Sequence, residues 1–218
     1  SPEEIRLRNK GIEEEFLNTS INLFNQADDS MRETINLFSV SARVPAAEAA
    51  EMIAVAFAET GETSADILGE VTNVAESVAN ATNIPIKQLQ QGIVAVRTDM
   101  NFFTDATVEG AARMAASLSQ VGLSINTFKA MMTPFRDFDT AVTKIGDISA
   151  MFGVQMDAME MMYLANEDEA TFLERFREQM IDQGIDVENM SNTRMRALSS
   201  QLGMNVNTIR NFLRDGDM

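Results

Sequence analysis

The chain of 218 residues is 45% hydrophobic and 23% charged, a composition typical of folded proteins and not of disordered ones. It carries 33 acidic and 17 basic residues, so its net charge of −16 disfavours a nucleic-acid partner unless basic side chains gather locally. It has no histidine and no cysteine, which excludes the commonest general base, the commonest transition-metal ligand and any internal disulfide. We expect neither a cofactor nor a metal.

Helical spacing of apolar residues runs through most of the chain. Only 11 glycines and 4 prolines interrupt it, and strong helix formers such as Ala, Leu, Met and Glu dominate. In residues 12–24 the apolar side chains share one helical face, made of Ile12, Phe16, Leu17, Ile21 and Phe24. The stretch 31–40 repeats this pattern with Met31, Ile35, Leu37 and Phe38. We therefore predict an all-α fold of about nine to eleven helices.

A seven-residue pattern recurs between these helices: a small residue, an apolar residue, a capping residue, an apolar residue, two variable residues and another apolar residue. It is clearest in GMNVNTI at 203–209, and GLSINTF at 122–128 shares its Asn-Thr pair. Further copies begin at Gly153, Gly184 and Asn83, and looser ones at Arg43 and Gly61. We predict that each copy is a tight helix–helix joint.

The residue types in this pattern explain how such a joint forms. Glycine or asparagine ends a helix in the left-handed conformation, and the following apolar residue packs beneath the joint. Ser, Thr, Asp or Asn then caps the next helix, and proline is also tolerated at a helix entry. The pattern predicts a compact, solenoid-like stack. We place a domain boundary at Thr133-Pro134, which gives domains 1–133 and 134–218.

The last joint also resembles the turn of a DNA-binding helix-turn-helix. Its neighbourhood holds the main basic cluster of the chain, Arg194, Arg196, Arg210 and Arg214, with Asp215 and Asp217 beside it. A recognition helix needs such side chains facing the groove. A motif that occurs several times in one chain is, however, better explained as a structural joint, and nucleic-acid binding by residues 192–214 is kept as an alternative.

Most acidic clusters of the chain are explained by helix surfaces and helix ends. Glu13-Glu14-Glu15 is expected on a solvated helix face, and Glu167-Asp168-Glu169 at the start of a helix over 170–181. Asp137 and Asp139 lack the glycine and the further ligands of a calcium loop.

Two further features invite a functional interpretation. Glu76-Ser77 is similar to the catalytic pair of lytic transglycosylases, but it lies within a helix and the accompanying motifs are missing. The 16 methionines, among them Met131, Met132, Met156, Met159, Met161 and Met162, are expected in the core and not in a peptide groove. Neither phosphate-binding loop motif occurs. We expect no enzymatic activity.

In the central stretch, a helix that ends in VANATN (78–83) precedes a polar cap and an apolar helix over 86–96, and an Ala-rich helix with its joint follows over 111–128. This order of elements resembles the conserved core of phage tail tape measure proteins. The resemblance covers roughly residues 45–165. Residues 133–154 depart from the family, whose members often carry a glycine-containing stretch there.

The resemblance implies a structural role in a virion. Proteins of this family thread the growing tail tube and set its length through their own length, and they are made in the host cytoplasm. Expected partners are tube, tip or baseplate proteins and further copies of the chain. Because the chain begins at Ser1 and breaks its helices at every joint, we expect a compact helical domain of a longer protein.

Overall fold

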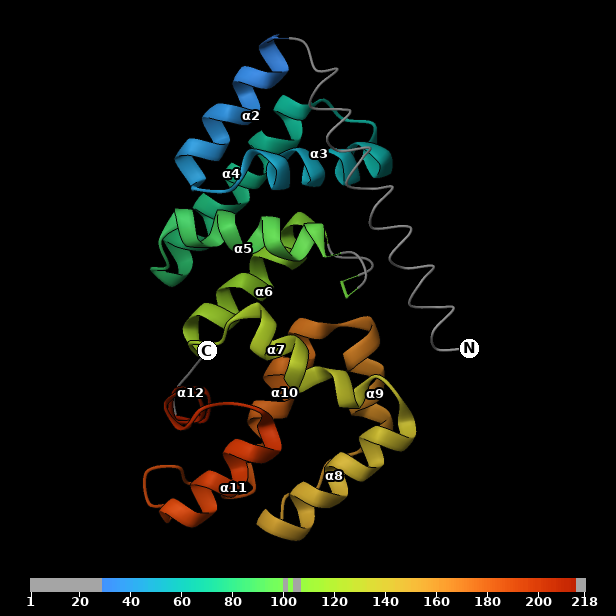
Figure 1. Ribbon diagram of the computed structural model, residues 1–218, viewed down its shortest axis with the longest axis vertical. Helices are drawn as coiled ribbons and strands as arrows, with labels where there is room; N and C mark the ends of the chain where they lie inside the picture. Colours follow the sequence, from blue (N-terminus) through green and yellow to red (C-terminus); the bar gives the residue numbers. More distant parts are fainter. Residues whose placement is uncertain (1–28, 100–101, 104–106, 215–218) are drawn as a thin grey trace. The chain divides into compact units, whose positions relative to one another are not determined.

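The computed structural model describes residues 29–99, 102–103 and 107–214, and this part is all-helical (Figure 1). Its eleven α-helices confirm the predicted fold class. The first five are α2 (Asp29–Ala42), α3 (Ala46–Thr60), α4 (Ser64–Thr82), α5 (Ile86–Thr98) and α6 (Val108–Gln120). The others are α7 (Ile125–Met132), the 3₁₀ turn η1 (Thr133–Phe135), α8 (Phe138–Phe152), α9 (Ala158–Glu167), α10 (Glu169–Asp182), α11 (Asn192–Leu202) and α12 (Val206–Phe212). The predicted helix at 12–24, with its three glutamates, lies outside the described residues.

All seven predicted joints begin with a residue in the left-handed conformation. Their φ angles run from 56° to 90°, and no other residue of the described ranges has a positive φ. The seven are Arg43, Gly61, Asn83, Gly122, Gly153, Gly184 and Gly203. For most residues other than glycine this conformation costs about 1–2 kcal/mol, so the pattern marks places where the backbone must reverse.

The apolar second residue of each joint is buried, as predicted. The residues in this position are Val44, Ile84, Leu123, Val154, Ile185 and Met204, and only the Gly61 joint departs, with Glu62 exposed. In four joints the N–H of this residue also donates to the carbonyl five residues earlier, at 2.8–3.2 Å. The four donors are Val44, Leu123, Ile185 and Met204. This bond satisfies a carbonyl that the end of the helix leaves without a partner.

The capping residue is correctly predicted in five joints and wrong in two. Thr63, Ser124 and Asn205 accept a hydrogen bond from the N–H three residues later, and prolines stand at the N-caps of α3 and α5. After Gly153 the cap is Asp157 and not Gln155. After Gly184, Asp186 caps only a turn, and α11 begins later with Ser191 as its cap.

The two exceptions are linked by a pair of hydrogen bonds that sequence spacing does not reveal. The Gln155 N–H donates to Gln183 Oε1, and Gln183 Nε2 donates to the Gln155 carbonyl, both at 2.6 Å. Gln155 therefore lies outside a helix, and its backbone N–H and carbonyl are satisfied by the side chain of Gln183 from the next joint. Asp157, whose carboxylate accepts two backbone N–H groups, then starts α9.

The chain divides into two compact units, residues 1–116 and 117–218. In the described part of the N-terminal unit, α2, α3, α4 and α5 pack against one another (Figure 1). Its core consists mainly of alanine, valine, isoleucine and leucine. A Cβ built on Gly92 of α5 would lie 2.4 Å from the Cβ of Ala115 of α6, so glycine is needed for the close approach of these helices.

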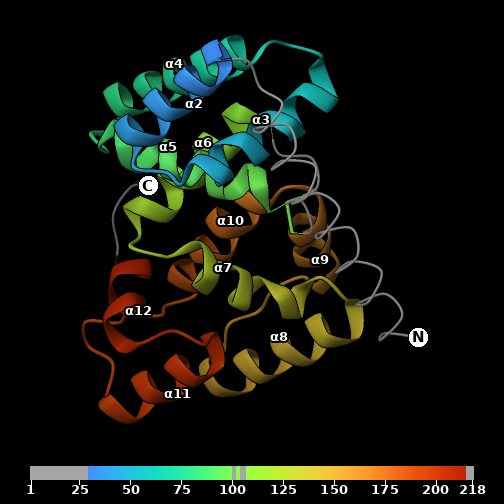
Figure 2. The same ribbon diagram turned by 45° about the horizontal axis from the view of Figure 1, so that its top comes forward.

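Five phenylalanine rings form the centre of the C-terminal unit. Phe172 and Phe176 of α10 stack on each other at a centroid distance of 5.9 Å. Phe172 also contacts Phe128 and Phe135, and Phe176 contacts Phe135 and Phe212. All five rings are 0% exposed. The helix that carries two of them, α10, accordingly lies between α9 and α12 in both ribbon views (Figure 2).

This ring cluster explains why the observed division lies upstream of the boundary expected at 133/134. Phe128 of α7 and Phe135 of η1 both contact Phe172, so the segment around Pro134 belongs to one core. Pro134 stands at the start of a 3₁₀ turn, where a missing N–H costs nothing, and it does not separate two domains.

One predicted apolar face is wrong in part. In α2, Ile35 and Phe38 are buried, but Leu37 is 65% exposed. At 100° per residue Leu37 lies across the helix from Ile35, so both cannot face the same core. Val40, 78% exposed, stands near Leu37 on that outer side.

Candidate functional surface of the C-terminal helix pair

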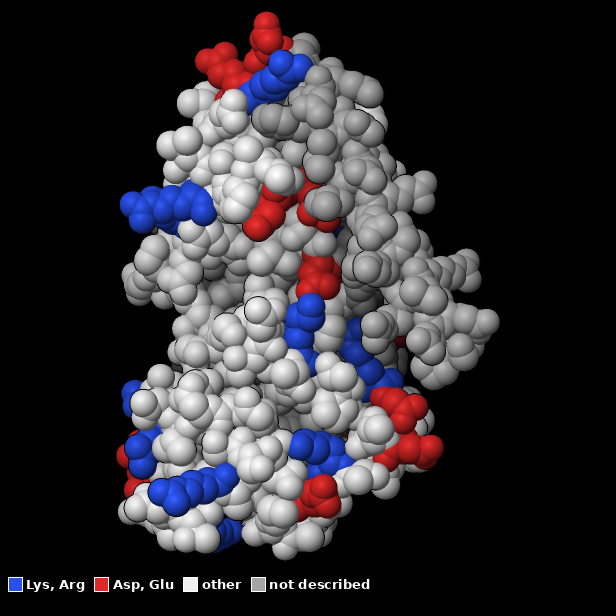
Figure 3. Space-filling view, viewed as in Figure 1, with Lys and Arg blue, Asp and Glu red and all other residues white. Residues whose placement is uncertain are grey.

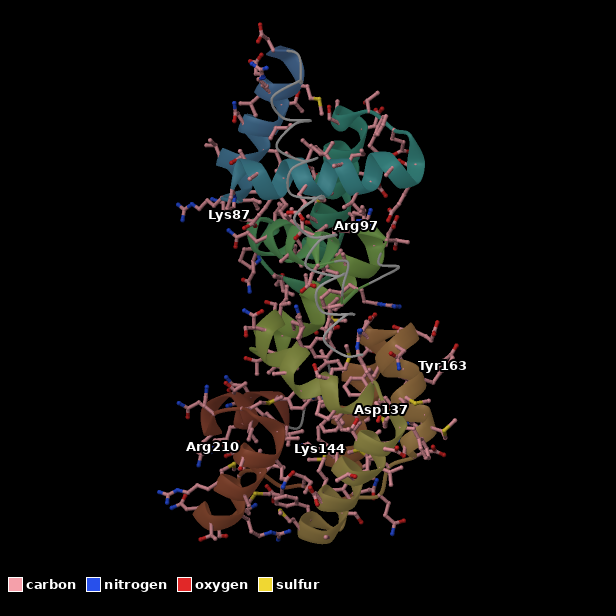
Figure 4. All side chains as sticks on the ribbon, turned by 45° about the vertical axis from the view of Figure 1, so that its right-hand side comes forward. Lys87, Arg97, Asp137, Lys144, Tyr163 and Arg210 are labelled. Atoms are coloured by element: carbon pink, nitrogen blue, oxygen red, sulfur yellow. The ribbon has the colours of Figure 1, made fainter. Side chains whose placement is uncertain are left out.

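The four arginines proposed as a basic cluster lie on α11, on α12 and just after α12, and all four are exposed. The Arg194 guanidinium lies over the ring of Phe152 at 5.7 Å, a cation–π contact that holds it against α8. Arg210 points outward from α12 at the lower left of Figure 4. Arg214 Nη2 donates to Asn211 Oδ1 at 3.5 Å. Asp215 and Asp217 lie outside the described residues.

α12 is short for a recognition helix. It has seven residues, of which Ile209 and Phe212 are buried in the core. Arg210 is the one basic residue within it, and Arg194 and Arg196 belong to the preceding helix. The structure therefore distributes the arginines over two helices, and does not line them along a single helix that could enter a groove.

Side chains from other helices cap the ends of this helix pair. Arg177 of α10, only 8% exposed, donates through Nε to the Phe212 carbonyl at 2.8 Å and through Nη2 to the Arg214 carbonyl at 2.6 Å. Lys144 of α8 donates to the Gln201 carbonyl near the end of α11 (Figure 4). Cations are favoured at helix C-termini because the last carbonyls lack partners. Burial lowers the pKa of Lys144, and the nearby Asp147 opposes that shift.

The sequence alone does not predict this role of Arg177 and Lys144. Each stands in a helix with an otherwise ordinary mixed composition, and their acceptors lie 35 and 57 residues away. A signal was present only in α10, where Arg177 follows Phe176 on the apolar side of the helix. A side chain from another helix also caps a helix end in the N-terminal unit, where Gln91 Nε2 of α5 donates to the Ala42 carbonyl at the end of α2.

The carboxylates singled out in the sequence serve mainly as helix caps and ion-pair partners. Asp168 accepts from the Thr171 N–H at the start of α10, as predicted, and Glu169 pairs with Arg136 at 3.1 Å. Asp137 Oδ1 accepts from the N–H groups of Asp139 and Thr140 at the start of α8. Glu76 is exposed in the middle of α4.

The methionines divide between core and surface. Met131, Met132 and Met161 are at most 3% exposed, which agrees with the predicted core role. Met159 is 56% exposed on α9 and stands one turn before Tyr163, which is 63% exposed. Met156 and Met162 are half-buried.

Comparison of the chain with models of known protein families, with curated proteins and with solved structures finds no match in any of the three. In the described ranges, no three His, Cys, Asp or Glu side chains gather as a metal site would require. No helix in the same ranges is long and apolar enough to cross a membrane.

Proposed function

We propose that the chain is a structural, non-enzymatic domain of a tape-measure-type tail protein, located in a virion tail and acting through protein–protein contacts. It would form part of a longer chain whose length sets the length of the tail tube. The partners would be tube, tip or baseplate proteins. The proposal rests on the resemblance of residues 45–165 to the core of that family.

The observation that best supports a structural role is that polar side chains at the joints cap the following helices. Thr63, Ser124, Asp157 and Asn205 each accept a backbone N–H at the start of a helix. The most buried cations, Arg97 and Arg177, pair with Glu59 and with helix-end carbonyls respectively. These contacts hold helix ends and neighbouring helices together, and most of the joints reverse a helix in the same way.

The test is the length of the tails after an in-frame change in the parent gene. Duplicating a helical stretch next to the region that encodes this segment should lengthen the tails, and deleting the same stretch should shorten them. A helix advances about 1.5 Å per residue, so a 40-residue change corresponds to a shift of about 60 Å. Electron micrographs of purified particles measure that shift directly.

A synonymous recoding of the same stretch is the matched control, because it alters the gene and leaves the protein unchanged. Tails of unchanged length in both the duplication and the deletion would reject the tape measure proposal. Shifts of opposite sign and similar size would support it. Loss of tails in both would point instead to a scaffold or injected virion protein, which is the nearest alternative.

A nucleic-acid module remains the alternative from another class, because four exposed arginines lie in 194–214. Binding of duplex DNA that falls steeply with salt and disappears in Arg210→Gln/Arg214→Gln would favour it.

A further inference from the structure

Exposed apolar side chains concentrate on the hairpin of α8 and α9. The described ranges hold nine large apolar side chains that are exposed, and five of them belong to these two helices. The five are Phe138, Val142, Met151, Met159 and Tyr163. Surfaces of folded proteins carry scattered apolar residues, whereas a contiguous group of them is typical of a contact surface.

Four of the five form two pairs with the same spacing. Phe138 and Val142 lie four residues apart on α8, and Met159 and Tyr163 lie four residues apart on α9. This spacing places the members of each pair on one face of their helix, one turn from each other. Tyr163 lies at the outer edge of α9 in Figure 4. We call these four residues the α8–α9 patch.

The two pairs adjoin because the end of α9 is tied to the start of α8. Asn166 Nδ2 donates to the Arg136 carbonyl just before α8 at 3.2 Å, and to the Met162 carbonyl within α9 at 2.8 Å. Phe138 follows Arg136 by two residues, and the half-buried Met162 stands next to Tyr163. Since α8 and α9 also pack against each other, the exposed pair on α8 continues into the exposed pair on α9.

Carboxylates flank this patch. Residues 137–167, from the cap of α8 to the end of α9, hold six acidic residues and one basic residue. Figure 3 shows acidic side chains at its lower right, where the start of α8 and α9 lie in Figure 1. The basic residue, Lys144, lies on the α11 side of α8, where it donates to the Gln201 carbonyl. The acidic residues are Asp137, Asp139, Asp147, Asp157, Glu160 and Glu167.

Two of these carboxylates are placed to meet the cations of a partner. Asp139 stands three residues before Val142, and Glu167 stands four residues after Tyr163, so each is exposed one turn from the patch. Cations that approach the hairpin from neighbouring elements are paired with glutamates at 2.9–3.1 Å: Arg136 with Glu169, and Arg175 with Glu160. A ligand that fits this surface therefore combines apolar and positive groups. The acidic rim disfavours anionic lipids and nucleic acids.

We propose that the α8–α9 patch is the docking site for a basic amphipathic helix of a partner protein. The apolar face of that helix covers Val142, Met159 and Tyr163, and its Lys or Arg side chains meet Asp139 and Glu167. A helix that binds in this way presents apolar anchors one turn apart, which matches the spacing of the two exposed pairs. Methionine beside aromatic rings adapts to such anchors. The inference goes beyond the proposed function and holds whether or not the chain belongs to a virion tail.

The test uses Tyr163 as its own reporter. It is the only tyrosine of the chain, which has no tryptophan, so tyrosine fluorescence reports on this patch alone. The probe is a synthetic peptide of leucine, lysine and alanine with the leucines on one helical face, about 18 residues and thus about 27 Å long. Titrating it into the full chain at low salt should give a saturable change in emission, and raising the salt should weaken the binding.

Two identical substitutions separate the patch from the rest of the hairpin. Met159→Gln should weaken binding of the peptide about tenfold, because it puts an amide among the apolar contacts. Met151→Gln is the matched control and should leave the affinity unchanged. Met151 is 49% exposed but lies nine residues from Val142, which at 100° per residue is the opposite side of α8. Because both methionines are exposed, helix content and melting temperature should match those of the wild type.

Two control peptides test the chemistry of the partner. One carries glutamate in place of lysine, and the other has the same composition scrambled so that no apolar face forms; neither should change the emission. The proposal is overturned if the basic peptide gives no saturable change, if the glutamate peptide binds equally well, or if the two methionine variants bind the basic peptide alike.

Two other results would overturn the proposal by assigning the patch to a different occupant. A change of emission with vesicles of phosphatidylcholine and phosphatidylglycerol, but not with the basic peptide, would assign the patch to a lipid surface. An emission that varies with the concentration of the chain alone, with no response to the peptide, would assign it to a second copy.

Discussion

The two units reach dense packing with different side chains. In the N-terminal unit, helices approach closely through small residues, and at Gly92 a single added methyl group would collide with Ala115. In the C-terminal unit, large rings fill the space between helices, and five phenylalanines share one cluster. Close helix contacts through small residues, as at Gly92, leave no room for added atoms. A cluster of large rings leaves a large void when atoms are removed. The two units should therefore respond to opposite kinds of substitution.

The two units also differ in the residue type that takes the left-handed position of each joint. In the C-terminal unit all four left-handed residues are glycines, whereas Arg43 and Asn83 take this position in the N-terminal unit. Asparagine tolerates the conformation better than most residues, but arginine has no such advantage. The Arg43 joint is supported from outside by Gln91, which donates to the Ala42 carbonyl at 2.9 Å.

Phe172→Ala should give the largest effect, because the ring contacts three others and its removal leaves a cavity. Replacing a buried phenylalanine by alanine costs about 3–5 kcal/mol. Hydrogen exchange read by mass spectrometry should show the loss of protection in 117–214 and little change in 29–99. Phe138→Ala, where the ring is 44% exposed, is the control and should cost much less. Equal losses in the two variants would mean that the ring cluster is not the core of this unit.

Gly92→Ala should destabilise the N-terminal unit by about 1–3 kcal/mol, because the new methyl group forces α5 away from α6. Gly69→Ala is a matched change on α4, where an added Cβ meets nothing within 4 Å. That variant should gain about 0.5–1 kcal/mol through helix propensity. If thermal unfolding shows that Gly92→Ala lowers the stability and Gly69→Ala raises it, the close approach of α5 and α6 is confirmed. A gain in both would contradict it.

Gly203→Ala should cost about 1–2 kcal/mol, because its φ of 66° is unfavourable for a residue with a Cβ and nothing else crowds the site. Gly203→Asn should cost less, since asparagine adopts this conformation more readily. Urea unfolding of the two variants separates backbone strain from packing. If alanine and asparagine cost the same, the left-handed conformation is not what selects glycine here.

The joints were predictable because each depends on residues that are neighbours in the sequence. A left-handed residue, a buried apolar residue and a cap all lie within three positions, so their chemistry can be recognised without knowing the fold. Even Arg43 was found in this way, although its side chain gives no sign of a left-handed backbone. The pattern failed after Gly153, where the side chain of Gln183 satisfies the Gln155 backbone, and after Gly184, where Asp186 caps only a turn.

Two features could not be predicted in the same way: the division into units, and the hydrogen bonds that Arg177 and Lys144 donate to carbonyls at the ends of α12 and α11. Both depend on which helices meet, and residues far apart in the sequence decide that. Pro134 looked like a domain boundary, but Phe135 beside it contacts Phe172 and Phe176 of α10. The role of Arg177 depends on the end of α12, 35 residues away in the sequence, against which its guanidinium is buried. The four arginines of the candidate surface are all exposed, and their contact with nucleic acid stays a prediction.

The smallest expected effect concerns Glu70 on α4, and it tests the electrostatics of the tightly packed unit. Burial raises the pKa of Glu70, and the nearby Glu109 and Glu62 raise it further, against the opposing influence of Arg97. A carboxyl group whose pKa is higher in the folded than in the unfolded chain stabilises the fold when it is protonated. That stabilisation is present below the unfolded pKa of 4.5 and is lost as the pH rises through the folded pKa.

Glu70→Gln should therefore raise the free energy of unfolding at neutral pH by roughly 0.2–0.5 kcal/mol, which a slightly higher melting temperature would show. The effect is small because solvent screens a partly exposed charge. The gain over the wild type should vanish in acid, where Glu70 itself is protonated. Glu76→Gln, at an exposed position of the same helix, is the control and should change little at either pH. A gain that persists in acid would have to come from packing or helix propensity, and the charge of Glu70 would then play no part in the stability of this unit.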